Sequence, residues 1–173
     1  SALPLSLPGY QAITAGHRTR CDDNDCPRID EETLAEGLGR RLHLPADQTA
    51  TFASWARLAN AASSRDGVVL VDAPPPGPPH AGGPPWDDAR WDEETVTRAL
   101  AHWRTSKPRF LHLALLDMDE QAHLKDAVAT VKALRFADET IATLLAEVDR
   151  LPEAERRLTT VLITTDHGRG PGR

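Results

Sequence analysis

Two pairs of side chains in this 173-residue chain have the types and spacing of metal ligands. Asp119 and His123 form a D-x-x-x-H spacing, which places both side chains on one face if a helix begins there. Asp166 and His167 are adjacent and end an apolar stretch. A carboxylate beside a neutral imidazole suits zinc or a similar divalent ion, and two such pairs could hold two ions about 4 Å apart.

Each pair also has a structural interpretation. An Asp-His dipeptide after a strand is often a turn or a cap, and D-x-x-x-H on a helix is often a solvated face. The position of both pairs after predicted strands favours the metal-site interpretation. The other histidines match no motif and are expected to be structural or exposed: His17, His43, His80, His102 and His112.

Ser6 precedes a short helical pattern, SLPGYQAITAG, that Gly16 closes. A hydroxyl at a helix N-terminus can attack phosphorus, and the positive end of the helix dipole favours anionic oxygens there. The structural alternative is that Ser6 only caps the helix.

Strand patterns alternate with helical patterns along the chain. Four stretches rich in Val, Ile, Leu, Thr and Phe are typical of buried parallel strands: 49–54, 67–72, 109–117 and 158–166. Helices are expected over 30–42, with Asp30 as the N-cap, over 93–104 and over 123–149. This order predicts an α/β fold with a mostly parallel sheet and helices on both faces. Ligands of such sheets bind at the carboxyl ends of the strands.

The segment 72–88, DAPPPGPPHAGGPPWDD, contains half of the 14 prolines of the chain and is predicted to be a surface loop. A lid, a ligand of a proline-recognition domain and a tolerated insertion are the three interpretations of this loop.

The composition excludes two classes of partner. The chain has 26 acidic and 20 basic residues, a net charge of -6, and no cluster of Lys or Arg that could follow phosphates, which argues against nucleic-acid binding. No apolar run approaches the roughly 18 residues of a membrane span, so no span is expected in this segment.

Cys21 and Cys26 flank the polar stretch CDDNDC. Thiols five positions apart can close a disulfide loop in an oxidising compartment, or they can stay free. The absence of a second cysteine pair argues against structural zinc. We expect this stretch to form a surface loop, because it is too polar for a core.

The order of the motifs resembles the alkaline phosphatase superfamily, and within it the branch of nucleotide pyrophosphatases/phosphodiesterases. The resemblance spans nearly the whole chain. It rests on three motifs in this order. The first is a hydroxyl-x-Pro sequence at Ser6, followed by a helical pattern that ends in Thr-x-Gly at Gly16. The second is D-x-x-x-H at Asp119 and His123, and the third is T-D-H-G at residues 165–168. It implies that Ser6 is the nucleophile and binds one metal ion with Asp166 and His167. It implies that Asp119 and His123 bind a second ion, and that both groups converge at one edge of the sheet.

Three features depart from that family pattern. The family has an Asp on the first strand and a downstream His, and neither has a counterpart within this chain. We therefore expect residues 1–173 to be a single partial domain, truncated at both ends and inactive by itself. The third departure is Gly9, where the family often has an Asn that touches the phosphate.

The resemblance implies a metal-dependent hydrolase of small-molecule phosphate esters that uses two divalent ions, zinc or manganese, and no organic cofactor. The alternatives are a catalytically inactive metal-binding or interaction domain, and a related sulfatase or phosphonate hydrolase. The chain does not begin with Met, which fits either a removed signal peptide or a start that lies further upstream. The sequence leaves the location open, with a periplasmic or secreted one preferred.

Overall fold

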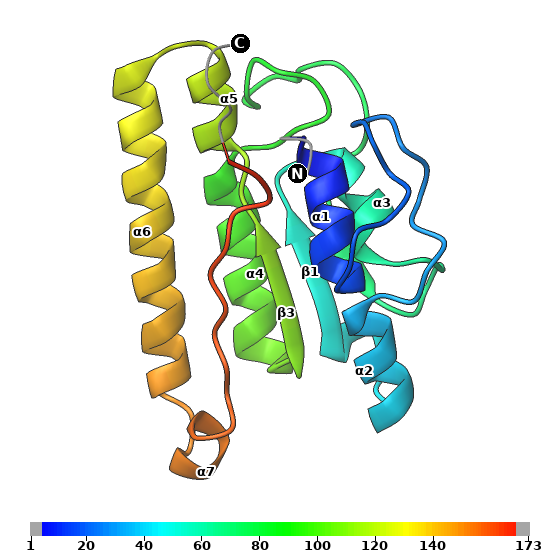
Figure 1. Ribbon diagram of the computed structural model, residues 1–173. Helices are drawn as coiled ribbons and strands as arrows, with labels where there is room; N and C mark the ends of the chain where they lie inside the picture. Colours follow the sequence, from blue (N-terminus) through cyan, green and yellow to red (C-terminus); the bar gives the residue numbers. More distant parts are fainter. Residues whose placement is uncertain (1–4, 169–173) are drawn as a thin grey trace. The chain divides into compact units, whose positions relative to one another are not determined.

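The computed structural model describes residues 5–168 (Figure 1). The chain divides into two compact units. The described part of the first unit comprises residues 5–115 and 165–168, and the second unit comprises residues 116–164.

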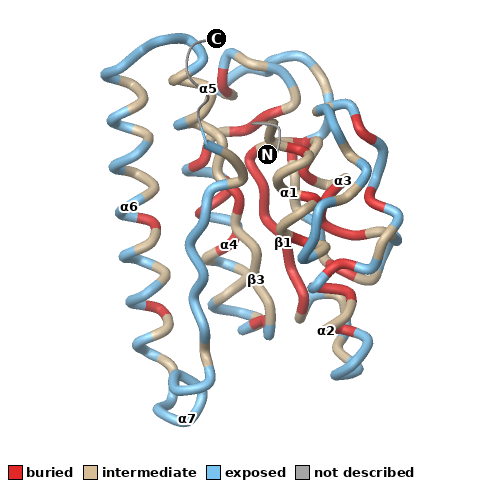
Figure 2. Tube along the Cα trace, viewed as in Figure 1, coloured by how far each residue is buried: buried red, intermediate tan, exposed pale blue. Residues whose placement is uncertain are grey.

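The first unit is built on a three-stranded parallel sheet of order β2-β1-β3, which confirms the predicted α/β class. The strands are β1 (Thr49–Ala53), β2 (Leu70–Asp72) and β3 (Phe110–Ala114). The central strand β1 is buried along its whole length (Figure 2). A strand covered on both faces needs apolar or small residues at every position, as the sequence TATFA provides.

Helices cover both faces of this sheet. Ala50 and Phe52 of β1 pack with Ala99 of α4 (Asp92–Ser106). Thr49, which points to the opposite face, lies against Gly39 of α2 (Leu34–Leu42). The sequence predicted α4 over 93–104, so its position was correct and its length was underestimated.

The helix α1 (Ser6–Ala15) ends at Gly16, whose φ of 78° is in the left-handed region that glycine tolerates. Tyr10 of α1 packs against a cluster that contains Ala53 and Ala114, the last residues of β1 and β3. The short helix α3 (Ala59–Ala62) and two 3₁₀ turns, Ala46–Gln48 and Ala56–Leu58, complete the unit.

The start of α2 differs from the prediction. Thr33, and not Asp30, is the N-cap: its hydroxyl accepts from the Glu36 N–H, while the Glu36 carboxylate accepts from the Thr33 N–H at 2.8 Å. This reciprocal pair is a capping box, which satisfies two N–H groups at the start of the helix at once. Glu36 is buried and also accepts from Ser63 Oγ and Ser64 Oγ.

A buried polar network joins the carboxyl ends of β1 and β2 to the start of α4. Ser54 Oγ donates to Asp92 Oδ1 at 2.5 Å and contacts Thr95 Oγ1 at 2.8 Å. The Arg90 guanidinium donates to Thr95 Oγ1 and to the side chain and backbone of Asp72. These groups satisfy one another away from water, so the network holds the sheet end in place.

The second unit consists of α5 (Asp117–His123), α6 (Ala127–Asp149) and α7 (Glu153–Arg156). The helix predicted over 123–149 is correct in outline but begins later, because Lys125 has a φ of 60° and Asp126 caps the new helix by accepting from the Ala129 N–H. No helix in the described part of the chain is both long and apolar enough to cross a bilayer.

The fourth predicted strand, 158–166, is wrong. This stretch has strand-like composition, but the described chain gives residues 160–163 no backbone hydrogen bonds to a neighbouring strand. Leu158, Leu162 and Ile163 are exposed. Strand propensity reflects packing against neighbours, so without a paired neighbour the residues remain extended but form no strand.

The proline-rich segment is a loop, as predicted, from residue 73 onward. Asp88 closes it: the Gly77 N–H donates to Asp88 Oδ1, and the Asp88 N–H donates to the Gly77 carbonyl, both at 2.8 Å. Trp91 Nε1 donates to the Gly82 carbonyl at 3.0 Å. The loop is therefore fastened at its base and at its middle.

The stability of the fold is expected to depend on pH through His112 of β3. Its ring centroid lies 6.2 Å from that of Tyr10, and burial lowers the pKa of His112 to about 4. The unfolded side chain binds its proton near pH 6.5, so the folded state loses stability as the pH falls below that value. Between about pH 7 and pH 5, the wild-type chain should lose about 2 kcal/mol more than His112→Phe, as measured by urea unfolding.

The control for this comparison is His43→Asn, because His43 is exposed and should leave the pH dependence unchanged. Equal losses of stability in the wild-type chain and His112→Phe would show that His112 is not kept neutral by burial.

Candidate functional site

Ser6 and the Asp166-His167 pair come together in the first unit, although they are far apart in the sequence. Ser6 Oγ lies 3.1 Å from His167 Nε2, and Asp166 Oδ2 lies 3.5 Å from the same nitrogen. Ser6 is the first residue of α1, so its side chain projects from the positive end of the helix dipole. The three candidate ligands of the first expected metal site are therefore neighbours.

The second ring nitrogen of His167 determines what the first one can do. His167 Nδ1 lies 3.2 Å from the Gly168 carbonyl. A carbonyl oxygen only accepts, so this bond places a proton on Nδ1, and in the neutral imidazole the lone pair then lies on Nε2. Metal-binding histidines are commonly oriented in this way, by a hydrogen bond from the nitrogen that does not bind the metal.

This arrangement differs from that of a serine-histidine-aspartate triad. In a triad the serine and the carboxylate contact opposite nitrogens of the imidazole. Here the Ser6 hydroxyl and the Asp166 carboxylate both face Nε2. Oxygen and nitrogen lone pairs that face one another repel unless a proton or a cation lies between them. Hydroxyl, carboxylate and imidazole together form a donor set that fits zinc or manganese.

Gly9 allows this site to form. A Cβ atom at residue 9 would lie 2.3 Å from the Asp166 carbonyl oxygen and 2.9 Å from its carbonyl carbon. The Asp166 backbone therefore approaches α1 where only glycine leaves room. This contact gives a physical reason for a glycine at residue 9, because a larger side chain such as Asn would displace Asp166.

Asp119 and His123 lie together in the second unit. Both are on α5, and Asp119 Oδ2 is 3.2 Å from His123 Nε2, as the i,i+4 spacing predicts. The first turn of α5 is acidic: burial raises the pKa of the nearby Glu120 carboxyl, with His123 opposing this shift and Asp119 adding to it. The pair offers one carboxylate and one imidazole to a cation.

The expected convergence of the two groups remains a prediction. Ser6, Asp166 and His167 belong to the first unit, whereas Asp119 and His123 belong to the second. The geometry within each group is defined, and each group alone has the donor types that the two-metal hypothesis requires.

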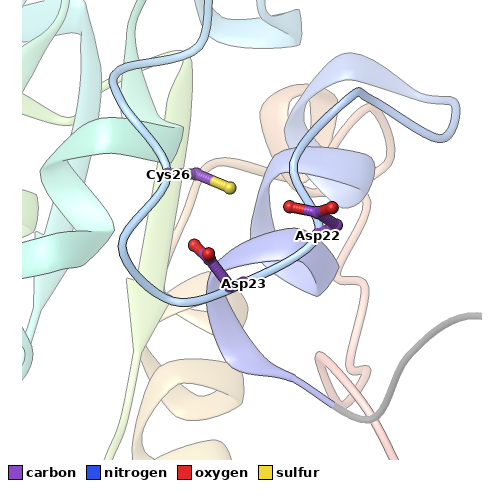
Figure 3. A group of neighbouring side chains, drawn as sticks. All are labelled: Asp22, Asp23 and Cys26. Atoms are coloured by element: carbon purple, nitrogen blue, oxygen red, sulfur yellow. The ribbon is translucent and has the colours of Figure 1, made fainter.

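An acidic cluster that the sequence interpretation did not treat as a site lies between the cysteines. Potential ligand atoms of Asp22, Asp23 and Cys26 lie within 4.8 Å of one another (Figure 3). Cys26 is, however, bonded to Cys21, so its sulfur cannot bind a metal as a thiolate. Two exposed carboxylates remain, which is a common surface arrangement.

The disulfide settles the question that the sequence left open, and it confirms that the cysteines are close enough to bridge. The stretch is a loop with exposed aspartates, as expected, but one of its two cysteines does not lie at the surface. Cys26 is buried and packs with Leu7 and Ala61, so the polar loop places one of its sulfurs in a small core. The aspartates of CDDNDC can remain exposed because they lie between two anchored ends.

Sequence reasoning missed Asn24, whose side-chain oxygen accepts from the Leu7 N–H at 2.9 Å. Leu7 follows the candidate nucleophile directly. The sequence shows an amide side chain between two cysteines that can form a disulfide. It does not show that this side chain accepts from a backbone N–H 17 residues away.

The Gly9 contact predicts an unusual response to alanine. Gly→Ala inside a helix normally stabilises by about 1 kcal/mol. At Gly9 the new Cβ would meet backbone atoms, so Gly9→Ala should instead destabilise the chain by about 1–3 kcal/mol and shift the NMR signals of Asp166 and His167.

Gly37→Ala is the matched control, because a Cβ there would meet only the Glu32 side chain, at 3.6 Å. It should stabilise the chain in the usual way. The same increase in melting temperature for both variants would show that α1 and Asp166 are not in close contact.

Comparison with known proteins gives this chain no relative: no family model, no curated protein and no solved structure matches it.

Proposed function

We propose that this chain carries the nucleophile and metal ligands of a hydrolase that acts on phosphate esters, with Ser6 as the attacking residue. The observation that supports this proposal best is the approach of Ser6 Oγ and the Asp166 carboxylate to the same nitrogen of His167. Three donors around one point suit a shared cation better than a proton relay.

In the proposed reaction, the Ser6 oxygen attacks phosphorus and forms an O–P bond as the ester P–O bond breaks. The proton that the Ser6 hydroxyl gives up passes to the leaving oxygen, which departs as an alcohol, and water then hydrolyses the phosphoserine to serine and phosphate. A divalent cation held by Ser6, Asp166 and His167 would supply charge stabilisation for the serine oxygen. The positive end of the α1 dipole favours negative charge at the same place.

Asp119 and His123 have a separate role in this proposal. Their paired carboxylate and imidazole would hold a second cation, which would offset charge on the leaving oxygen. Two protein ligands are fewer than the three of an ordinary catalytic zinc site, so this pair needs a further donor.

The main alternative is a catalytically inactive domain that binds metal through the same side chains. Metal content alone does not distinguish the two functions, whereas a covalent phosphoserine at residue 6 does. Sulfate and phosphonate esters are further substrate candidates, since the same donors would serve them.

Replacing Ser6 provides the direct test. The resemblance places one ligand of each metal site outside residues 1–173, so the assay uses a chain extended at both ends by its own coding sequence, with zinc or manganese added. Ser6→Ala should lower the hydrolysis of an aryl phosphate ester by more than about 10³-fold and abolish labelling of residue 6. Aryl sulfate and aryl phosphonate esters are assayed in parallel.

Ser106→Ala is the control, because Ser106 is the last residue of α4 and its backbone carbonyl, not its hydroxyl, accepts from Gln48 Nε2. Full activity of Ser6→Ala would rule out the nucleophile, and metal binding without any turnover or labelling would favour the inactive domain.

A second test measures the separation of the two groups. Mn²⁺ bound at Asp166 and His167 should broaden the NMR signals of Asp119 and His123 strongly, since a two-metal site requires the groups to lie within about 10 Å of each other. His167→Asn should remove the broadening. A crystal structure with a separation above about 10 Å would contradict the two-metal mechanism.

A further inference from the structure

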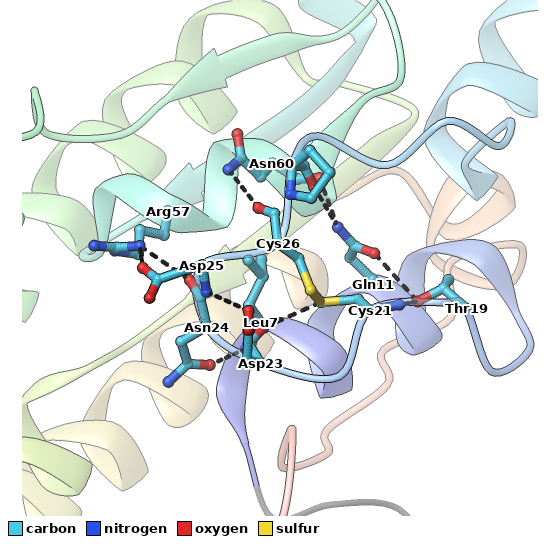
Figure 4. The surroundings of a disulfide bond; sticks show 11 residues. Leu7, Gln11, Thr19, Cys21, Asp23, Asn24, Asp25, Cys26, Arg57 and Asn60 are labelled. Atoms are coloured by element: carbon cyan, nitrogen blue, oxygen red, sulfur yellow. Dashed lines mark hydrogen bonds and ion pairs between the residues drawn. A yellow bond between two sulfur atoms is a disulfide. The ribbon is translucent and has the colours of Figure 1, made fainter.

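The first turn of α1 depends on a residue outside the helix. Leu5, at the N-cap position, makes no side-chain cap, so the first N–H groups of α1 need other acceptors. Leu7 is fully buried, and its N–H therefore cannot turn to bulk water. Asn24 Oδ1 accepts this N–H at 2.9 Å and is the external partner of this first turn (Figure 4).

Asn24 is itself held on both sides. It lies inside the loop that the Cys21–Cys26 disulfide closes, with 5.6 Å between the two Cα atoms. Arg57 Nη1 donates to the Asn24 carbonyl at 3.1 Å and also pairs with the Asp25 carboxylate. Asn60 Nδ2 donates to the Cys26 carbonyl at 3.2 Å. The loop is thus attached to the segment 57–60 as well as to α1.

The Leu7 N–H belongs to the peptide group that joins Ser6 to Leu7. Fixing that planar group limits the orientation of the Ser6 Cα–Cβ bond and therefore the place of Ser6 Oγ. Ser6 Oγ lies 3.1 Å from His167 Nε2, a distance at which a small displacement would break the contact. Misplacement of a reacting group by about 1 Å can cost about 10²-fold in rate.

We propose that Asn24 is a positioning residue for Ser6, and that the Cys21–Cys26 disulfide maintains it in that role. The catalytic consequence rests on the proposed function, whereas the structural consequence does not. Reduction by a dithiol breaks the S–S bond, forms two thiols and oxidises the dithiol to its own disulfide. The released loop then holds Asn24 less firmly, which makes Ser6 sensitive to the redox state of its surroundings.

The test compares Asn24→Ala with Asn24→Asp. The aspartate keeps an oxygen in the place of Oδ1 and its charge suits a helix N-terminus, so it should retain the contact. Asn24→Ala should lower the exchange protection of the Leu7 amide by at least about 10-fold and change the ¹⁵N shift of His167 Nε2. In the extended chain, kcat should fall about 10–100-fold with little change in KM.

Asp22→Ala is the control from the same loop, because Asp22 is exposed and the Arg57 bonds to this loop go to Asn24 and Asp25. Treatment of the wild-type chain with dithiothreitol is the second measurement, which also serves if Asn24→Ala does not fold. It should reduce the Leu7 protection and shift His167 in the same direction, and reoxidation should restore both signals.

The outcomes separate this inference from the proposed function. Unchanged Leu7 protection and an unchanged His167 shift, in Asn24→Ala or after reduction, would overturn the inference even if the enzyme is active. Changed signals in a protein that hydrolyses no phosphate ester would support the positioning role and contradict the proposed function.

Discussion

The contact between Gly9 and the backbone of Asp166 is the constraint on which the candidate site depends. An added Cβ atom would lie 2.3 Å from the Asp166 carbonyl oxygen, so the first turns of α1 and the segment 165–168 can approach only because residue 9 has no side chain. Ser6 and His167 extend from the two sides of this contact and meet at 3.1 Å. At a wider separation, the Ser6 hydroxyl and the His167 imidazole could neither bind the same cation nor share a proton.

The opposite side of α1 is held by a different kind of interaction. Leu7, Cys26 and Ala61 form a small core, and the disulfide loop adds two hydrogen bonds, in which the Asn24 side chain accepts from the Leu7 N–H and the Asn24 carbonyl accepts from Arg57. Further along, Tyr10 packs at the carboxyl ends of β1 and β3. The helix α1 is therefore held by apolar packing and, at its first turn, by the loop that the Cys21–Cys26 disulfide closes. Such support from neighbouring groups is what a reactive side chain requires to keep one orientation.

Few side chains of the second unit are buried. Its buried residues are Thr140 and Glu147, whereas several large apolar side chains of α6, among them Val128 and Leu134, are exposed. Asp119 and His123 meet because of helix periodicity alone, through an i,i+4 spacing on α5. A local pairing of this kind needs no tertiary support, which explains why it could be predicted from the spacing.

The α/β class, the places of three of the four predicted strands, the proline-rich loop and the Asp119–His123 pairing could be predicted from the sequence, because they follow from local composition and periodicity. The three strands are shorter than predicted. The start of α2 at Thr33 and the break at Lys125 depended on particular hydrogen bonds and backbone angles. The stretch 158–166 has strand composition, yet a strand exists only where a neighbour pairs with it. Only the tertiary structure decided that Gly9 admits Asp166 and that Asn24 reaches Leu7, because both contacts join segments whose spacing in the sequence carries no periodic signal.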